Sequence, residues 1–357
     1  MNQQTKPSAN LRPLGLTAVL CLFAISAALD LAYGTAIIGY LLMMAMVGVL
    51  AVIFLTCERY IFVLDAAATL VILFFAANSS LFAALFGLVL IIAALILAQT
   101  VRKKKEKVSV VLAVCFTVFI GYAIVWTILY AADGNSLAPS DLLDRLNAYF
   151  DSLKTPLADA VHHYVDALSD EVFAYYQKYD ITREMLLQSY LELMENYVDV
   201  MQMLLPGFSL FVVQVMAYIG VTSFVKTVKA THYDALLPEV RWFLYPSQPA
   251  CVIYLIVTSL YAILSFFSAS SAFLLVVMNL WLALMPVMLA CGFRSLKARL
   301  AHPRLRRSMI VILILFVIGI FFMPDAALPI GIFMLTFMGA QDVSVMRAAE
   351  SAKKKSK

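Results

Sequence analysis

The sequence predicts an all-α fold: a polytopic α-helical integral membrane protein with about ten transmembrane helices and a helical insertion outside the membrane. Of its 357 residues, 63% are hydrophobic and only 13% are charged, and the mean hydropathy is +0.91. Soluble domains carry about 45–50% apolar and about 25% charged residues. The apolar residues fall in separate blocks close to the roughly 20 residues that a helix needs to cross a bilayer. The short alternating strands of an outer-membrane barrel do not fit these blocks.

Ten apolar blocks are predicted to span the membrane, five on each side of one long polar segment. The first five form an N-terminal membrane domain over 1–131, and the last five form a C-terminal membrane domain over 207–343. The last two blocks are short, so they form either a tilted pair or a re-entrant hairpin. The predicted spans cover residues 14–33, 35–56, 60–77, 80–99, 108–131, 207–225, 248–267, 271–292, 309–323 and 326–343.

Residues 132–206 form the polar segment, which contains 13 acidic and four basic residues and has a net charge of −9. Apolar residues recur at helical spacing throughout it, so we expect amphipathic helices. Pro156 is expected to restart the chain in a second helix, and Asp180 to cap a third. Pro206 is expected to kink or break the chain before the sixth span.

Lysine and arginine residues in the short loops predict the orientation. The loops at 100–107, 226–241 and 294–308 are basic, as is the tail at 344–357, and in a ten-span chain all of them lie on one side. Both termini are therefore expected in the cytoplasm of a cell (plasma) membrane protein, and the acidic segment outside. Outside that segment the chain carries a net charge of +13.

The stretch "DAVHHYVDALSDE" suggests a metal site, because carboxylate and imidazole groups can hold a divalent cation. On a helix, four of its side chains would share one face: Asp159, His163, Asp166 and Asp170. A histidine among carboxylates could also sense pH. The alternative is a solvated acidic face of an amphipathic helix, which is the commoner origin of such a stripe.

Four polar residues lie inside predicted spans, where ionisable groups are candidates for function. Asp30 and Asp65 lie near span ends, whereas Gln214 and Asn279 lie deeper and could bridge helices or line a cavity. Ala24, Ala28 and Ala32 recur every fourth residue, a spacing that lets helices approach closely.

The later half contains "MLLPGFSLFVVQ" at 203–214 and "ALLPEVRWFLYPSQP" at 235–249. With Pro206, Pro238, Trp242 and Pro246, this arrangement resembles the YybS-like family of uncharacterised bacterial multi-pass membrane proteins. In physical terms, Pro238, Trp242 and Pro246 form an anchor at the inner membrane interface. The front half is similar in layout to the substrate-binding subunits of energy-coupling-factor vitamin transporters.

No catalytic motif is present in the sequence: it lacks H-E-x-x-H, G-x-S-x-G, the Walker lysine loop and G-x-G-x-x-G. The five cysteines have no zinc spacing. We therefore expect no enzyme and no cofactor. The expected partners are the lipid bilayer and membrane proteins bound through the acidic segment, with no nucleic acid. The leading hypothesis is a membrane scaffold or envelope-associated partner protein, and the alternative is a small-molecule transporter or its substrate-binding subunit, whose substrate the sequence does not identify.

Overall fold

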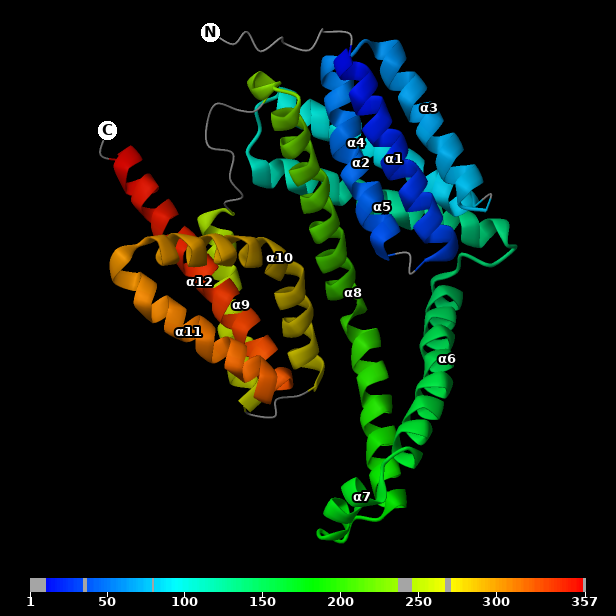
Figure 1. Ribbon diagram of the computed structural model, residues 1–357, viewed down its shortest axis with the longest axis vertical. Coiled ribbons are helices and arrows are strands. Elements are labelled where there is room, and N and C mark those ends of the chain that lie inside the picture. The colour runs from blue at the N-terminus through cyan, green and yellow to red at the C-terminus, as the bar shows by residue number, and fades with distance from the viewer. Residues whose placement is uncertain (1–10, 35–36, 79, 237–245, 267–270, 356–357) are drawn as a thin grey trace. The chain divides into compact units, whose positions relative to one another are not determined.

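The computed structural model describes residues 11–34, 37–78, 80–236, 246–266 and 271–355, in which twelve α-helices and a short 3-10 turn are present and no strand occurs. The all-α prediction is confirmed (Figure 1). The chain divides into two compact units. Unit 1 comprises Met1–Trp126 with Ser209–Lys357, and unit 2 comprises Thr127–Phe208.

The first five helices contain the first five predicted spans. They are α1 (Leu11–Tyr33), α2 (Ile37–Thr56), α3 (Arg59–Ala76), α4 (Leu81–Arg102) and α5 (Lys107–Ala132). Within unit 1, α2 packs against α1, α3 and α4. Its stretch from Met43 to Ile53 is buried except at Ala45, so α2 is the central helix of this group. Ser80 begins α4 by accepting a hydrogen bond from the Ala83 N–H, as a helix N-cap does.

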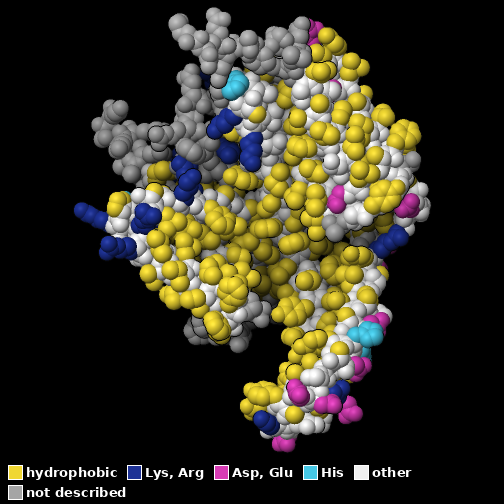
Figure 2. All heavy atoms as spheres, viewed as in Figure 1, with side chains coloured by type: hydrophobic (Ala, Val, Ile, Leu, Met, Phe, Trp, Pro, Cys, Tyr) yellow, Lys and Arg dark blue, Asp and Glu magenta, His cyan; other side chains and the backbone are white. Residues whose placement is uncertain are grey.

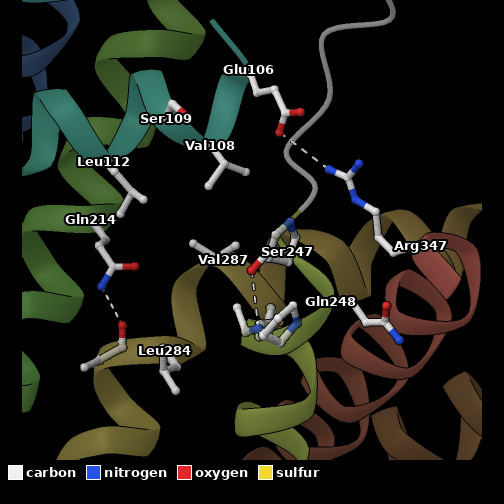
Figure 3. A pocket seen from close by; sticks show the side chains of 15 residues that line it. Glu106, Val108, Ser109, Leu112, Gln214, Ser247, Gln248, Leu284, Val287 and Arg347 are labelled. Carbon is white, nitrogen blue, oxygen red and sulfur yellow. Dashed lines mark hydrogen bonds and ion pairs between the residues drawn. The ribbon is translucent and has the colours of Figure 1, made fainter. Parts of the chain in front are cut away.

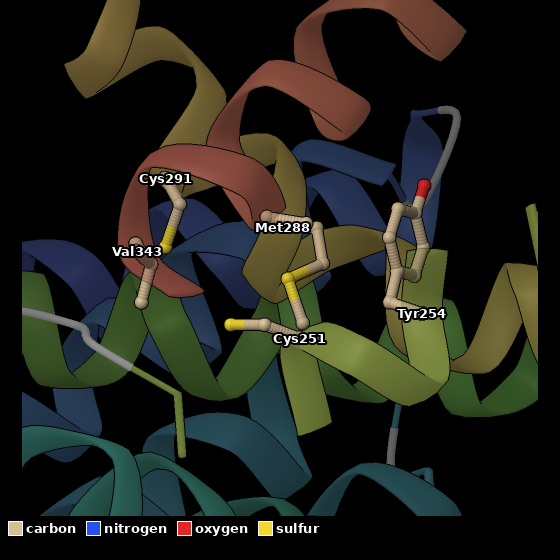
Figure 4. Packing of buried hydrophobic residues seen from close by; sticks show 6 residues of the cluster. Cys251, Tyr254, Met288, Cys291 and Val343 are labelled. Atoms are coloured by element: carbon tan, nitrogen blue, oxygen red, sulfur yellow. The ribbon is translucent and has the colours of Figure 1, made fainter. Parts of the chain in front are cut away.

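The remaining helices include the polar segment and the last five predicted spans. They are α6 (Pro139–Asp166), α7 (Asp170–Gln177), α8 (Arg183–Ala230), α9 (Gln248–Phe266), α10 (Ser271–Ala301), α11 (Pro303–Phe322) and α12 (Pro324–Lys355). Within unit 1, α9, α10 and α12 pack against one another. Their shared core contains Cys251, Tyr254, Met288, Cys291, Ala340 and Val343 (Figure 4).

Nine helices in the described part of the chain are long and apolar enough to cross a membrane. The tenth predicted span, at 248–267, coincides with α9, whose apolar portion Gln248–Leu264 is shorter than the other nine. The two final spans correspond to α11, with 20 residues, and α12, with 32. The predicted tail at 344–357 continues α12 as helix to Lys355.

The predicted restart of the chain at Pro156 is wrong, and of the kink or break predicted at Pro206 the break is excluded, because helices continue through both positions. α6 runs through Pro156, and α8 runs through Pro206 for 48 residues in total. A proline inside a helix removes the hydrogen bond to the carbonyl four residues earlier and crowds that carbonyl. At Pro156 that carbonyl belongs to the exposed Ser152, where water can replace the lost donor. Pro206 is exposed as well, at the end of the polar segment.

The predicted start of the third polar helix is also corrected. Asp180 does not cap it but lies in the preceding turn with a φ of 58°. Thr182 acts as the cap, because its hydroxyl oxygen accepts a hydrogen bond from the Met185 N–H at 3.1 Å. The helix therefore begins at Arg183, and the turn before it lets Arg183 reach back toward α7.

Glycines allow two pairs of helices to approach to backbone contact. Where α2 crosses α8, a Cβ on Gly48 would lie 2.7 Å from the Gly220 carbonyl oxygen. Ser223 reinforces this crossing by donating to the Ala45 carbonyl oxygen at 2.7 Å. Where α10 crosses α12, a Cβ on Gly339 would lie 2.6 Å from the Met288 carbonyl oxygen. Such close packing through small residues is typical of membrane helices.

Candidate functional site

The two acidic residues predicted inside the membrane are each bound to neighbouring groups. Asp30, on α1, accepts a hydrogen bond from the Gly39 N–H at 2.7 Å and so caps the start of α2 from another helix. Asp65 is buried on α3 and accepts a hydrogen bond from the Thr17 hydroxyl at 3.0 Å. Both contacts join helices: Asp30 links α1 to α2, and Asp65 links α3 to α1.

The two predicted membrane amides differ in their surroundings. Asn279 donates to the Leu275 carbonyl oxygen of its own helix at 3.0 Å. Gln214 bridges two helices, because its amide nitrogen donates to the Ala283 carbonyl oxygen of α10. Ala24 and Ala28 are fully buried on α1, in keeping with a packing role.

Gln214 also lines a pocket of about 690 Å³ in unit 1 (Figure 3). Side chains from α5, α8, α9, α10 and α12 surround it, and Leu112, Leu284 and Val287 supply apolar wall. At its polar end the Arg347 guanidinium forms an ion pair with the Glu106 carboxylate at 3.6 Å. No sequence signal marks Glu106 or Arg347 as a site residue, because each lies within a basic segment that is typical of a membrane rim.

The predicted metal residues belong to two helices. Asp159, His163 and Asp166 lie on α6, whereas Asp170 begins α7 and pairs with Arg183 at 3.1 Å. Across the described residues, no group of three or more histidine, cysteine, aspartate or glutamate side chains is placed to hold a metal ion. The geometry gives the metal hypothesis no support, and it stays a prediction.

Two of the three predicted anchor residues, Pro238 and Trp242, lie outside the described residues. The third, Pro246, precedes α9, is buried, and lines the same pocket as Gln214.

Unit 2 is a helical hairpin with a thin core. Phe150 and Val165 of α6 and Val198 of α8 are buried in it. Polar contacts join the two helices along one side of this core: the Gln202 amide donates to the Asn147 side-chain oxygen at 2.6 Å, and Lys154 pairs with Asp199 at 3.1 Å.

Lys154 also pairs with Asp151 at 3.2 Å, so it lies between two carboxylates. Hydrogen bonds to Asp199 and Asp151 raise the pKa of the Lys154 ammonium above its ordinary value. Any stabilisation from the Lys154 cation is therefore present through neutral pH. It is lost as the pH rises through the raised pKa of this amine. Because Lys154 is partly exposed to solvent, its ion pairs add little stability. We call these contacts of Asn147, Gln202, Lys154 and Asp199 the polar seam, and they mainly set the register of the hairpin.

The other side of the hairpin carries exposed apolar side chains on both helices. Measured from the buried contacts of each helix, these side chains point the same way, opposite the polar seam. Tyr164 and Tyr190 meet across the helices with ring centroids 5.8 Å apart. We call this surface the aromatic face; it comprises Leu142, Tyr149, Leu157, Tyr164, Leu193, Tyr197, Val200 and Met201, which are 39–63% exposed.

Figure 2 shows that hydrophobic and charged side chains lie on different sides of unit 2. Hydrophobic side chains follow one side of the hairpin, and acidic and histidine side chains follow the other. The predicted metal residues Asp159, His163 and Asp166 are exposed on α6, the same helix as Tyr164. The sequence pattern indicated an amphipathic helix, but it did not show that two helices combine their apolar sides into one exposed surface.

Comparison with protein families matches most of this chain to a family model. Residues 21–335 match the family described as "Predicted membrane protein (DUF2232)". Comparison with curated proteins and with solved structures gave no match.

Proposed function

Since the chain belongs to the DUF2232 family of predicted membrane proteins, we propose that it is a non-enzymatic membrane scaffold that binds partner proteins through the aromatic face of unit 2. The observation that carries the proposal is the exposure of this face. Tyr197 is 61% exposed and Tyr164 is 56% exposed. A contiguous apolar surface of this kind on a polar segment is typical of protein interaction sites.

The proposal includes an orientation. The basic loops and the basic end of α12 lie in the cytoplasm, and unit 2, with its net charge of −9, lies outside. Pro206, Pro238, Trp242 and Pro246 follow the sequence pattern of the YybS-like proteins, and we propose that finer kinship. A role without catalysis is supported by the absence of a catalytic motif from the sequence.

The test is affinity purification from native membranes with two single variants. Tyr197→Glu places a charge in the aromatic face, whereas Asn196→Glu places the same charge on the neighbouring exposed position outside it. We expect envelope proteins to co-purify with the wild-type chain and the Asn196 variant, and to be lost with the Tyr197 variant. Recovery of the same proteins with all three chains would reject a partner site on this face.

The pocket beside Gln214 favours a second candidate, a small-molecule transporter or its substrate-binding subunit. Its volume of about 690 Å³ is within the range of small-molecule sites. The layout similarity to energy-coupling-factor subunits points the same way. Co-purification of ATPase subunits irrespective of the Tyr197 substitution would favour transport over the scaffold.

A further inference from the structure

We infer that the partner element bound by the aromatic face is a basic amphipathic helix of another protein. This inference rests on the proposed function and names the chemistry of the partner. Its basis is one exposed apolar surface, two helices wide, on a segment with 13 acidic and four basic residues.

The shape of the face suits a helix. Tyr164 and Tyr190 lie edge to face along the seam between α6 and α8, and Tyr149, Leu157, Leu193 and Tyr197 extend the apolar surface on both sides. A third helix packed along such a seam covers both apolar stripes with its own stripe, as in helix-in-groove recognition.

Acidic residues beside the aromatic face indicate which residues should flank the apolar stripe of the bound helix. Asp141 precedes Leu142, and Glu192 precedes Leu193, so each acid lies about 100° around the helix from a residue of the face. Both acids are exposed. A bound helix with lysine or arginine beside its apolar stripe could reach them with its long side chains.

Three of the four basic residues of unit 2 already contact groups within the unit, so its surface remains acidic overall. Lys154 lies between two aspartates, Arg183 pairs with Asp170, and the Arg145 guanidinium lies over the Tyr130 ring at 5.0 Å. The net charge of −9 disfavours an anionic lipid surface. It also disfavours a second copy of the same hairpin, because like charges repel at close approach. A basic partner is the occupant that complements the charge.

The test uses the full chain in nanodiscs of zwitterionic phosphatidylcholine and three fluorescent peptides of about 18 residues, or five helical turns. The first is an amphipathic leucine–lysine helix, the second is its leucine–glutamate counterpart, and the third is the leucine–lysine composition in scrambled order. Binding is followed by fluorescence anisotropy at low and high salt. The variants are Tyr197→Ser and Tyr164→Ser on separate helices, with Asn196→Ser as the matched control.

We expect only the ordered basic peptide to bind tightly, and more weakly at high salt. Tyr197→Ser and Tyr164→Ser should each weaken it about tenfold, as loss of a tyrosine anchor does, whereas Asn196→Ser should bind like the wild type. Circular dichroism of each variant checks that helix content is unchanged. Two tyrosine variants on different helices keep the test decisive if one of them misfolds.

Several results would overturn the inference: equal binding of the acidic peptide, no binding of any peptide, or basic binding unaffected by both tyrosine variants. A dimer of the chain that Tyr197→Ser dissociates would assign the face to a second copy. Quenching of a Tyr197→Trp variant by brominated lipid would assign it to the bilayer. Preference for the acidic peptide would reject the basic partner and leave the scaffold standing, whereas the scaffold itself fails if no co-purifying protein depends on Tyr197.

Discussion

At the scale of single residues, polar groups inside the membrane-spanning helices mainly hold helices together. Asp30 satisfies a backbone N–H at the start of α2, where an unpaired donor would be costly in hydrocarbon. Asp65 accepts from Thr17, and Ser223 donates to α2. Asp30 and Asp65, which the sequence marks as candidates for function, therefore have structural partners in the described part of the chain.

Asp30 gives the sharpest residue-scale prediction. Asp30→Ala removes the oxygen that accepts from the Gly39 N–H and should lower the free energy of unfolding by about 1 kcal/mol. Asp30→Asn keeps an acceptor oxygen at the same position and should lower it by less. Thermal unfolding in detergent measures both. Equal destabilisation by the two substitutions would show that the charge, and not the cap, is what the fold requires.

At the scale of elements, the helices of unit 1 depend on glycine at their crossings. Gly339 of α12 lies against the backbone of α10, where a Cβ would also meet the Gly292 Cα at 2.8 Å. The contact is continued along the same pair of helices, where Arg299 bonds Asp342 at 2.7 Å. The crossing and the ion pair together fix the register between α10 and α12.

Gly339→Ala should therefore destabilise this part of unit 1 by about 2 kcal/mol, because backbone atoms cannot move aside as a side chain can. Gly15→Ala on α1 is the matched control, since a Cβ there meets nothing within 4 Å. It should be neutral or stabilising by up to about 1 kcal/mol through helix propensity. Tryptophan fluorescence on thermal unfolding reports the change, because Trp281 stacks on Tyr261 between α9 and α10. Equal stability of the two variants would contradict the close crossing.

Helices could be predicted from the sequence because runs of apolar residues are a local signal. Contacts between helices could not be predicted, because they depend on residues far apart in the chain. Runs of apolar residues are local, and the ten predicted spans coincide with helices in the structure. The partner of Asp30 and the neighbours of Gly339 lie on other helices, and no spacing in one segment encodes them. Pro156 was misread because a general rule about proline outweighed the solvent exposure that lets α6 continue.

At the scale of the whole molecule, charge is separated along the chain. The segment at 132–206 has a net charge of −9, and the remainder has a net charge of +13, which the overall charge of +4 conceals. The separation coincides with the division into units, since unit 2 contains the acidic segment. It supports the proposed orientation and the attraction of unit 2 to basic partners.

Cysteine labelling in intact cells tests this orientation. Thr155→Cys lies on the exposed surface of α6, and Lys103→Cys lies in the exposed loop after α4. A membrane-impermeant maleimide should label the cysteine at 155 in intact cells, and the cysteine at 103 only after permeabilisation. The chain without an added cysteine corrects for the five native thiols. The reverse labelling pattern would invert the topology and place the aromatic face in the cytoplasm.

The acidic composition of unit 2 also bears on membrane insertion. In the proposed orientation, this segment crosses the bilayer during synthesis, toward the positive side of an energised membrane. Each negative charge carried across gains about 2.3 kcal/mol per 100 mV, so a net charge of −9 gains roughly 20 kcal/mol at that potential. The carboxylates beside the aromatic face would thus act before any partner arrives, by letting the membrane potential draw the hairpin outward during biogenesis.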